Sequence, residues 1–189
     1  MNYYDKNAQE FFDGTFDADM SSHHEKFIKY IPENSHILDA GCGSGRDTLM
    51  FKSLGFEVTS IDGSIEMCRL ASEYAKTEVL HMQFQEIEFK SIFDGIWASA
   101  SLLHVPSDEI EMVLTRLKDS LKDSGVLYAS FKYGDFEGMR NGRFFNDLTE
   151  ETAIELFKKT DFNIIKTWIT SDSRKGRENE KWVNILVKK

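Results

Sequence analysis

Short apolar segments alternate with amphipathic segments along most of this 189-residue chain. The apolar segments are bounded by turn residues and are rich in branched and aromatic side chains, a pattern that predicts buried β-strands. The predicted strands span residues 37–40, 57–62, 79–82, 93–99, 125–131, 163–169 and 181–187. The amphipathic segments predict helices, which span residues 21–31, 46–54, 65–75, 107–121 and 150–159.

The order of these segments predicts the fold class. Strand and helix alternate five times, and the last two strands form a hairpin. This order predicts an α/β fold with a doubly wound, largely parallel sheet and one antiparallel strand from the terminal hairpin. The length and the absence of repeats fit one domain over 1–189. Within it we expect an N-terminal helical segment over 1–31, a core over 36–132 and a final part over 133–189.

Composition narrows the class of protein. The formal net charge of −9 disfavours a dedicated nucleic-acid binder, because Lys and Arg must neutralise the phosphates. Cys42 and Cys68 match no metal-binding or redox spacing, so we expect no metal site and a reducing compartment. No apolar stretch is long enough to span a membrane, and the N-terminus lacks the pattern of a secretion signal. These features predict a soluble, cytoplasmic protein.

The first predicted strand runs into a turn with glycine at every second position, Gly41, Gly43 and Gly45. Glycine permits backbone conformations that a Cβ would forbid, and it lets a ligand approach the main chain. In a doubly wound sheet, ligands bind beyond the carboxyl ends of the strands, where this turn is expected to lie. The turn therefore predicts a ligand site, although three glycines can also serve a tight strand–helix turn without a ligand.

The residues around this turn indicate which ligand it binds. A dinucleotide site uses the spacing Gly-x-Gly-x-x-Gly, whereas this chain has Gly-x-Gly-x-Gly preceded by Asp39. An acidic residue there would repel a pyrophosphate and suits a cationic group. Asp62 ends the second strand, where a carboxylate can accept hydrogen bonds from both hydroxyls of a ribose. Together these residues describe an adenosylated amino acid better than a dinucleotide.

Asp39–Gly45, Asp62, Phe93–Trp97 and Leu117–Val126 follow one another in an order and spacing that resemble the class I S-adenosylmethionine-dependent methyltransferases. The similarity covers about residues 37–132. It implies S-adenosylmethionine as cofactor and S-adenosylhomocysteine as product. It also implies a Rossmann-like seven-stranded sheet in the order 3-2-1-4-5-7-6, with strand 7 antiparallel.

Two shorter runs are similar to particular branches of that family. Gly45–Thr48 resembles the tellurite-resistance branch, and Leu102–Val105 resembles the branch that acts on quinones. Both resemblances favour a small-molecule acceptor, and neither identifies it.

The resemblance assigns cofactor contacts to individual residues. Arg46 lies in the first turn of a helix, where a cation opposes the helix dipole, and pairing with the methionyl carboxylate would explain that placement. Phe84 and Gln85 would lie beside the adenine, although the family often has an acidic residue nearby. Asp62 could alternatively cap the following helix. The expected cofactor-binding residues are Asp39, Gly41, Gly43, Gly45, Arg46, Asp62, Gly63, Phe84 and Gln85.

A histidine and two loops indicate the acceptor side. His104 follows the fourth strand and could act as a general base, or it could be a packed residue. The reaction does not require a base, because alignment of the acceptor can supply most of the acceleration. The loops over 133–147 and 171–181 carry cations and aromatics suited to an anionic acceptor, although nearby acids dilute the charge. The expected acceptor-binding residues are Tyr133, Arg140, Arg143, Arg174 and Trp182.

The sequence therefore predicts an enzyme that transfers a methyl group from S-adenosylmethionine to a small molecule, with an anionic acceptor as one option. One alternative is a non-catalytic module that binds S-adenosylmethionine or S-adenosylhomocysteine. Another is a methyltransferase that acts on RNA or on a protein side chain. The aromatic residues at the N-terminus could form a lid over the site, which would exclude water, or a hydrophobic staple at the domain edge. The oligomeric state stays open.

Overall fold

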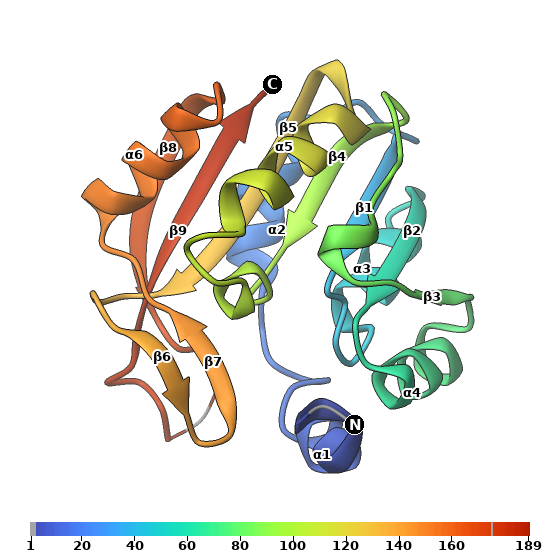
Figure 1. Cartoon of the computed structure of the whole chain (residues 1–189). Coiled ribbons are helices and arrows are strands. Elements are labelled where there is room, and N and C mark those ends of the chain that lie inside the picture. Colours follow the sequence, from blue (N-terminus) through green and yellow to red (C-terminus); the bar gives the residue numbers. More distant parts are fainter. Residues whose placement is uncertain (1–2, 175) are drawn as a thin grey trace.

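The computed structural model describes residues 3–174 and 176–189. Its main sheet has seven strands in the order β3-β2-β1-β4-β5-β9-β8 (Figure 1). These strands are β1 (His36–Ala40), β2 (Glu57–Asp62), β3 (Val79–His81), β4 (Phe93–Ala98), β5 (Leu121–Lys132), β8 (Asn163–Ser171) and β9 (Lys181–Lys188). Strand β9 is antiparallel to both of its neighbours, and the other pairs are parallel. Counted along this sheet the order is 3-2-1-4-5-7-6, which confirms the predicted fold class.

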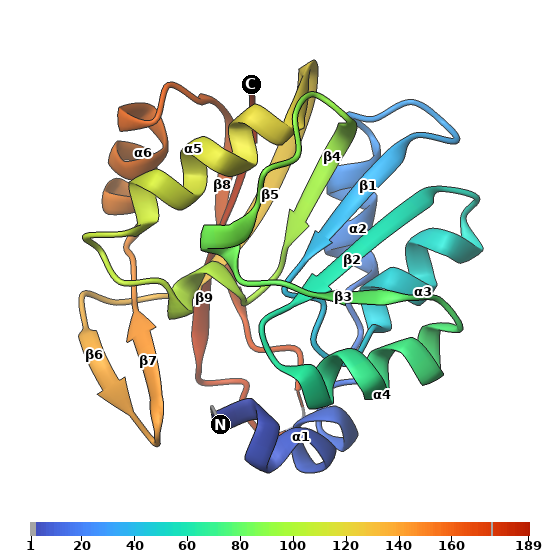
Figure 2. The same cartoon turned by 45° about the vertical axis from the view of Figure 1, so that its right-hand side comes forward.

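Helices cover both faces of the sheet, with α5 in front of the sheet and α2 behind it in Figure 2. The α-helices are α1 (Tyr3–Asp13), α2 (Ser21–Ile28), α3 (Arg46–Ser53), α4 (Ile65–Ala75), α5 (Ile110–Ser120) and α6 (Glu150–Lys159). Two short 3-10 helices are η1 (Phe84–Glu86) and η2 (Leu102–His104). Within the described residues, no helix is both long and apolar enough to cross a membrane.

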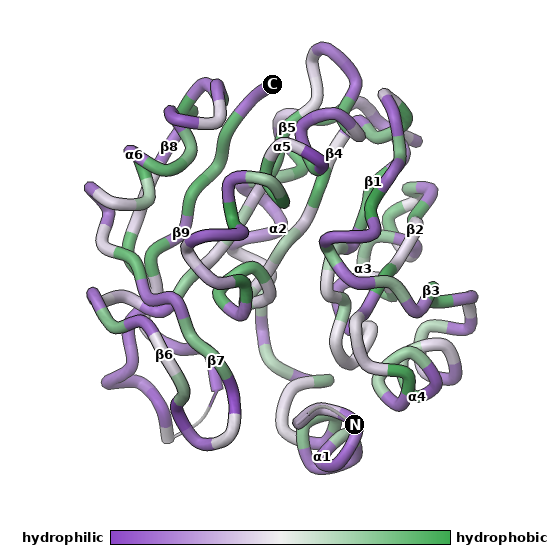
Figure 3. The backbone as a smooth tube through the Cα atoms, in the orientation of Figure 1, coloured by the Kyte–Doolittle hydropathy of each residue, from purple (hydrophilic) through white to green (hydrophobic). Residues whose placement is uncertain are grey.

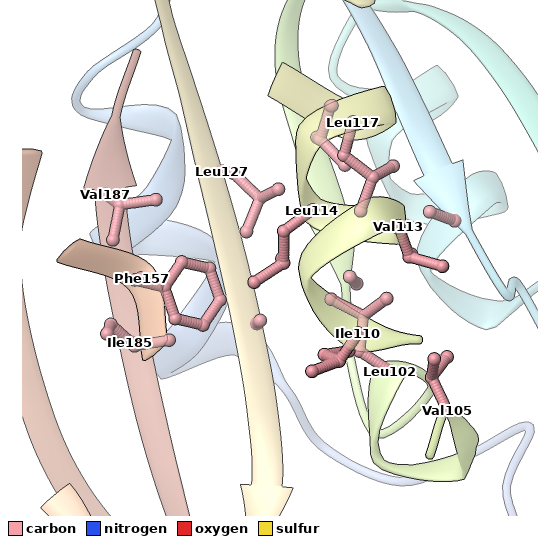
Figure 4. Close-up of a cluster of buried hydrophobic side chains, with 14 of the residues drawn as sticks. Leu102, Val105, Ile110, Val113, Leu114, Leu117, Leu127, Phe157, Ile185 and Val187 are labelled. Carbon is pink, nitrogen blue, oxygen red and sulfur yellow. The ribbon is translucent and has the colours of Figure 1, made fainter. Parts of the chain in front are cut away.

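Alternate residues of the central strands fill two separate cores. In β4, Ile96 belongs to the core beneath α5 and α6, whereas Trp97 belongs to the core beneath α2 and α3. Figure 4 shows Leu114 of α5 beside Leu127 of β5, and Phe157 of α6 over β9. Each fully buried large apolar side chain stabilises the fold by about 1.5–3 kcal/mol. The buried stretches of the central strands are accordingly rich in apolar residues, such as Ile37 and Leu38 of β1 and Ile96 of β4, and green segments run through these strands in Figure 3.

The parallel register places the carboxyl ends of β1, β2 and β4 at one edge of the sheet. Ala40 pairs with Ile61, and Asp39 pairs with Trp97. The glycine turn after β1, the end of β2 and the segment after β4 therefore meet at this edge. Helix α1 lies at the same edge in both views (Figures 1 and 2).

The structure corrects two details of the sequence analysis. The predicted loop over 133–147 contains a hairpin of β6 (Glu137–Arg140) and β7 (Arg143–Asn146), which form a separate sheet. The hairpin turns at Asn141 and Gly142, both with positive φ (51° and 77°), and Asn-Gly is the strongest short hairpin signal in a sequence. The helix predicted from 107 begins at Ile110, because residues 107–109 form a turn instead.

Candidate active site

The glycine turn has the geometry that its sequence demands. Gly41, Gly43 and Gly45 have φ values of 80°, 54° and 77°, which side chains with a Cβ rarely adopt. A Cβ on Gly41 would lie 2.5 Å from Cβ of Ser101, and one on Gly45 would lie 3.1 Å from Cβ of Ala71. Gly41 and Gly45 are therefore pressed against their neighbours, whereas a Cβ on Gly43 would only touch the ring of Phe11 at 3.4 Å.

Asp62 ties this turn to the end of β2. Its Oδ2 accepts a hydrogen bond from the Gly43 amide and its Oδ1 accepts one from the Ser64 amide, each at 2.9 Å. The helix cap is Ser64 itself, whose Oγ accepts from the Met67 amide, so Asp62 is not the cap. Burial raises the pKa of the Asp62 carboxyl. An ionised carboxylate has about four acceptor positions, so acceptor capacity remains after these two bonds.

A cavity of about 300 Å³ opens over the turn and the end of β2. Gln83 closes one side of it, because its Nε2 donates to the Gly63 carbonyl at 2.9 Å. Six of the predicted cofactor residues line this cavity, namely Gly41, Gly43, Asp62, Gly63, Phe84 and Gln85. A turn without side chains, a carboxylate with acceptor capacity and an aromatic ring fit an adenosyl group.

A second cavity of about 650 Å³ adjoins the first. It is lined by Arg46 and by all five predicted acceptor residues, namely Tyr133, Arg140, Arg143, Arg174 and Trp182. The residues shared by the two cavities are Tyr4, Phe11, Gly41, Gly43, Ala100, His104 and Arg143. These shared residues define the junction at which a cofactor and an acceptor would meet.

Two predicted cofactor residues line neither cavity. Asp39 is 2% exposed, and its Oδ2 accepts a hydrogen bond from Thr48 Oγ1 at 2.6 Å. Burial and the charge of Asp47 raise the pKa of the Asp39 carboxyl. Gly45 serves as the N-cap of α3. A direct contact between Asp39 and the cofactor therefore stays a prediction.

His104 lies at the junction and makes hydrogen bonds through both ring nitrogens. The Phe144 carbonyl lies 2.6 Å from Nδ1, so Nδ1 carries the proton and donates. In the neutral ring Nε2 is then an acceptor, and the hydroxyl of Tyr4 lies 2.7 Å from it. Burial, helped by Arg143, lowers the pKa of His104 to about 4. The imidazole is therefore neutral at pH 7.

The hydroxyl of Tyr4 also links His104 to Arg143. Arg143 Nη1 donates to Tyr4 Oη at 3.4 Å, which leaves the Tyr4 proton free to point at His104. Burial raises the pKa of Tyr4, so its hydroxyl keeps that proton. A chain of hydrogen bonds thus runs from Arg143 through Tyr4 and His104 to the backbone of β7. Sequence reasoning placed Tyr4 among the lid aromatics and missed this contact, for which the sequence contains no local signal.

Arg143 differs from the other described arginines that line the larger cavity. Those arginines pair with carboxylates, namely Arg46 with Asp47, Arg140 with Asp147, Arg174 with Asp172 and Arg177 with Glu180. Arg143 has no carboxylate partner among the described residues, and its buried Nε has no hydrogen-bond acceptor. It lies instead over the rings of Tyr3 and Phe145, each about 5.1 Å from the guanidinium carbon.

Among the described residues, no three His, Cys, Asp or Glu side chains come together as metal ligands would. The site thus consists of a glycine turn, an acid on the neighbouring strand and a cation-lined cavity beside them. These features define an adenosyl-binding α/β enzyme of the doubly wound class.

Comparison with known proteins identifies the family. A family model described as a methyltransferase domain matches residues 37–125. An uncharacterized methyltransferase from Staphylococcus carnosus is 30% identical over 172 residues, which is 83% of each chain. A glycine/sarcosine N-methyltransferase from Aphanothece halophytica is 33% identical over 121 residues, 58% of this chain and 46% of that protein. The chain belongs to the class I S-adenosylmethionine-dependent methyltransferases, as the sequence motifs indicated.

Solved structures agree on the fold. A Burkholderia thailandensis 1,6-didemethyltoxoflavin-N1-methyltransferase, crystallised with S-adenosylhomocysteine, superimposes with a TM-score of 0.80 at 21% identity. The match covers 97% of this chain and 84% of that chain. The prediction of an S-adenosylmethionine-dependent methyltransferase is confirmed. The individual cofactor and acceptor residues stay predictions, now with a geometry to test them.

Proposed function

We propose that the protein transfers the methyl group of S-adenosylmethionine to a small-molecule acceptor that carries a carboxylate or phosphate. The observation that carries this proposal is Arg143, a guanidinium at the junction of the two cavities that has no carboxylate partner among the residues that the structure describes. A partly buried cation without a counter-ion is costly, above all where its Nε is shielded from water, and an anionic ligand would reduce that cost. The planar fork of arginine suits carboxylate and phosphate groups in particular.

The two cavities divide the proposed task. The smaller one supplies the glycine turn and Asp62 for the adenosyl group, and the larger one, about 650 Å³, accommodates the acceptor. S-adenosylmethionine brings an activated methyl group, so the chain's own contribution is to orient the acceptor and exclude water. The N-terminal helix α1 supports that role, because its Tyr4 and Phe11 line both cavities.

His104 is the proposed proton acceptor for a hydroxyl or amine acceptor. At neutral pH its Nε2 lone pair accepts a hydrogen bond from the Tyr4 hydroxyl, and that hydroxyl in turn accepts one from Arg143 at the junction of the two cavities. A proton from the acceptor would therefore reach His104 by way of Tyr4. Because the pKa of His104 is about 4, we expect it to hold a proton transiently rather than to act as a strong base.

The name of one relative agrees with an anionic group on the acceptor without identifying it. Glycine and sarcosine, in the name of the Aphanothece halophytica relative, both carry a carboxylate. That relative is matched over less than half of its length, so its acceptors are not transferred to this chain. The buried thiols of Cys42 and Cys68, both free, agree with the cytoplasmic location expected from the sequence.

A labelled-methyl screen tests the proposal. The protein is incubated with methyl-labelled S-adenosylmethionine and, separately, with a metabolite extract, RNA and a protein fraction. We expect the label in a small molecule that mass spectrometry identifies as a carboxylate or phosphate. Label in RNA or protein would contradict the proposal, as would a labelled metabolite without an anionic group. Binding of S-adenosylhomocysteine without labelling of any fraction would favour a non-catalytic module.

Variants of Arg143 connect the label to the proposed anion site. Arg143→Ala should lower the rate of labelling about 10- to 100-fold, since a charge-assisted hydrogen bond to a buried anion is lost. Its affinity for S-adenosylhomocysteine should stay within about twofold. The labelling rate of Arg143→Lys should lie between those of the wild type and of Arg143→Ala, because lysine keeps the charge but not the planar fork. Arg69→Ala is the control, since Arg69 is exposed and pairs with Glu66 and Glu73. Equal loss of labelling and cofactor affinity would contradict the acceptor role.

A further inference from the structure

Asp47 is a buried carboxylate beside the glycine turn that accepts four hydrogen bonds. Arg46 donates two of them through Nε and Nη2, at 2.8 Å each. His24 of α2 donates through Nε2 at 2.9 Å, and Trp97 of β4 donates through Nε1 at 2.8 Å. Three elements therefore hold one carboxylate, which is itself 5% exposed. No role for Asp47 follows from the motifs of the sequence.

The hydrogen bonds to Asp47 fix the orientation of the Arg46 guanidinium. Asp47 takes the edge formed by Nε and Nη2, and Nη1 donates to the Thr15 carbonyl at 3.3 Å. A guanidinium has five N–H groups, so two remain after these three bonds. Arg46 lines the larger cavity beside Gly41, Cys42 and Gly43. Two N–H groups in a planar fork match the two oxygens of a carboxylate.

The charges agree with an amino-acid ligand. Burial alone would keep Asp47 protonated, but Arg46 and His24 outweigh it and hold the pKa of Asp47 far below its usual range. Asp47 and Arg46 thus form an ion pair with no net formal charge. The methionyl end of the cofactor is a zwitterion and also has no net formal charge. A paired guanidinium offers it directed donors without leaving an uncompensated buried charge.

We propose that Asp47 is a positioning residue that holds Arg46 ready to bind the α-carboxylate of the methionyl end of S-adenosylmethionine. His24 and Trp97 brace Asp47 in this arrangement. The proposal explains why a cation occupies the first turn of α3 against the helix dipole, since Asp47 in the same turn compensates it. It rests on the cofactor assignment and is independent of the acceptor proposed above.

Two ligands that differ in the methionyl end test this role. S-adenosylhomocysteine contains the amino-acid end, whereas 5′-methylthioadenosine keeps the adenosine and the thioether but lacks it. Their affinities are measured by calorimetry for the wild type and for each variant. Substitution of a residue that acts on the carboxylate should change only the affinity for S-adenosylhomocysteine. A residue that merely holds the fold should change both.

We expect Arg46→Ala to lower the affinity for S-adenosylhomocysteine about 10- to 100-fold and Asp47→Asn to lower it about 10-fold. Both variants should bind 5′-methylthioadenosine within about twofold of the wild type. Trp97→Phe keeps a ring against Tyr128 and removes one hydrogen bond from Asp47. Trp97→Phe should lower the affinity for S-adenosylhomocysteine alone, by about threefold. This variant tests the proposal if Asp47→Asn does not fold. Asp119→Asn and Arg69→Ala, both at exposed ion pairs, are matched controls that should change neither affinity.

Three results would overturn the proposal. If Asp47→Asn bound S-adenosylhomocysteine as well as or better than the wild type, Asp47 would only neutralise Arg46. If both affinities fell together in Asp47→Asn and in Trp97→Phe, Asp47 would serve the fold alone. If the wild type bound neither ligand, the cofactor assignment beneath the proposal would fail, and this outcome is distinct from the other two.

Discussion

His23, which is buried, and His104, which is partly buried, line the larger cavity and share one electrostatic property. Burial lowers the pKa of each to about 4, with Lys26 adding to the effect at His23 and Arg143 adding to it at His104. Both rings are therefore neutral in the folded protein at pH 7. A neutral ring can accept a hydrogen bond, which His104 does from Tyr4, and His23 can offer the same to a bound acceptor.

This property predicts how stability depends on pH. Between pH 6.5 and pH 4 the unfolded chain binds protons at these histidines and the folded chain does not, so protonation favours unfolding. The contribution of the two histidines to the free energy of unfolding is therefore fully present above pH 6.5, and it is lost as the pH falls toward 4. His23→Leu should reduce this loss by up to about 3 kcal/mol. Urea denaturation at pH 7, 6, 5 and 4 measures it. An unchanged pH dependence in the variant would contradict the assignment.

Helix α1, which carries most of the N-terminal aromatic residues, lies against the site. Asp5 accepts a hydrogen bond from Ser64 Oγ at 2.6 Å, and Phe11 lies against Gly43. Tyr4 and Phe11 line both cavities, whereas Phe12 and Phe16 pack against Tyr74 of α4. The helix therefore roofs the site and is anchored beside it. Whether it acts as a lid that opens and closes stays a prediction.

If α1 is a lid, Phe11, which lines the cavities, and Phe16, which packs on α4 after the helix ends, should affect ligand release differently. Phe11→Ala should accelerate dissociation of S-adenosylhomocysteine, because it removes apolar contact over the glycine turn. We expect a dissociation rate about tenfold higher, which stopped-flow fluorescence can measure. Phe16→Ala, which removes a similar area outside the cavities, is the control. Equal dissociation rates in the two variants would show that α1 does not retain the ligand through Phe11.

At the scale of the whole molecule, the proposed cofactor site lies between the ends of two neighbouring strands. The glycine turn follows β1 and Asp62 ends β2, and the hydrogen bond between Gly43 and Asp62 joins the two halves of the site. Ligand binding should therefore stabilise the fold as a unit. The stabilisation is about 2.7 kcal/mol at a ligand concentration 100 times its dissociation constant.

This stabilisation predicts a measurable shift in melting temperature. For a chain of this size, S-adenosylhomocysteine at that concentration should raise Tm by about 5–11 °C. Asp62→Ala at the same concentration should show little or no rise, because it loses both the ribose acceptor and the bond to the Gly43 amide. Scanning calorimetry checks both values. A full shift in the variant would exclude Asp62 from the cofactor site.

The sequence alone determined the strands, the glycine turn and the family, because burial leaves a local record. The neighbouring apolar residues Ile96 and Trp97 point to opposite faces of the sheet, and both faces are covered. Glycine occurs at 41, 43 and 45 because the backbone has a positive φ at these positions. The hairpin turn at Asn141 and Gly142 was equally visible in the sequence, although it was interpreted as loop.

Only the tertiary structure decided which charged groups face each other. Asp39, expected at the ligand, bonds to Thr48 away from both cavities, and Asp47 accepts from two other elements besides its own. Arg143 became distinct from the other cavity-lining arginines only once their carboxylate partners were known. The physical reason is that periodicity along the chain reports which side chains of an element are buried, whereas the partner of a charge depends on residues that folding brings together.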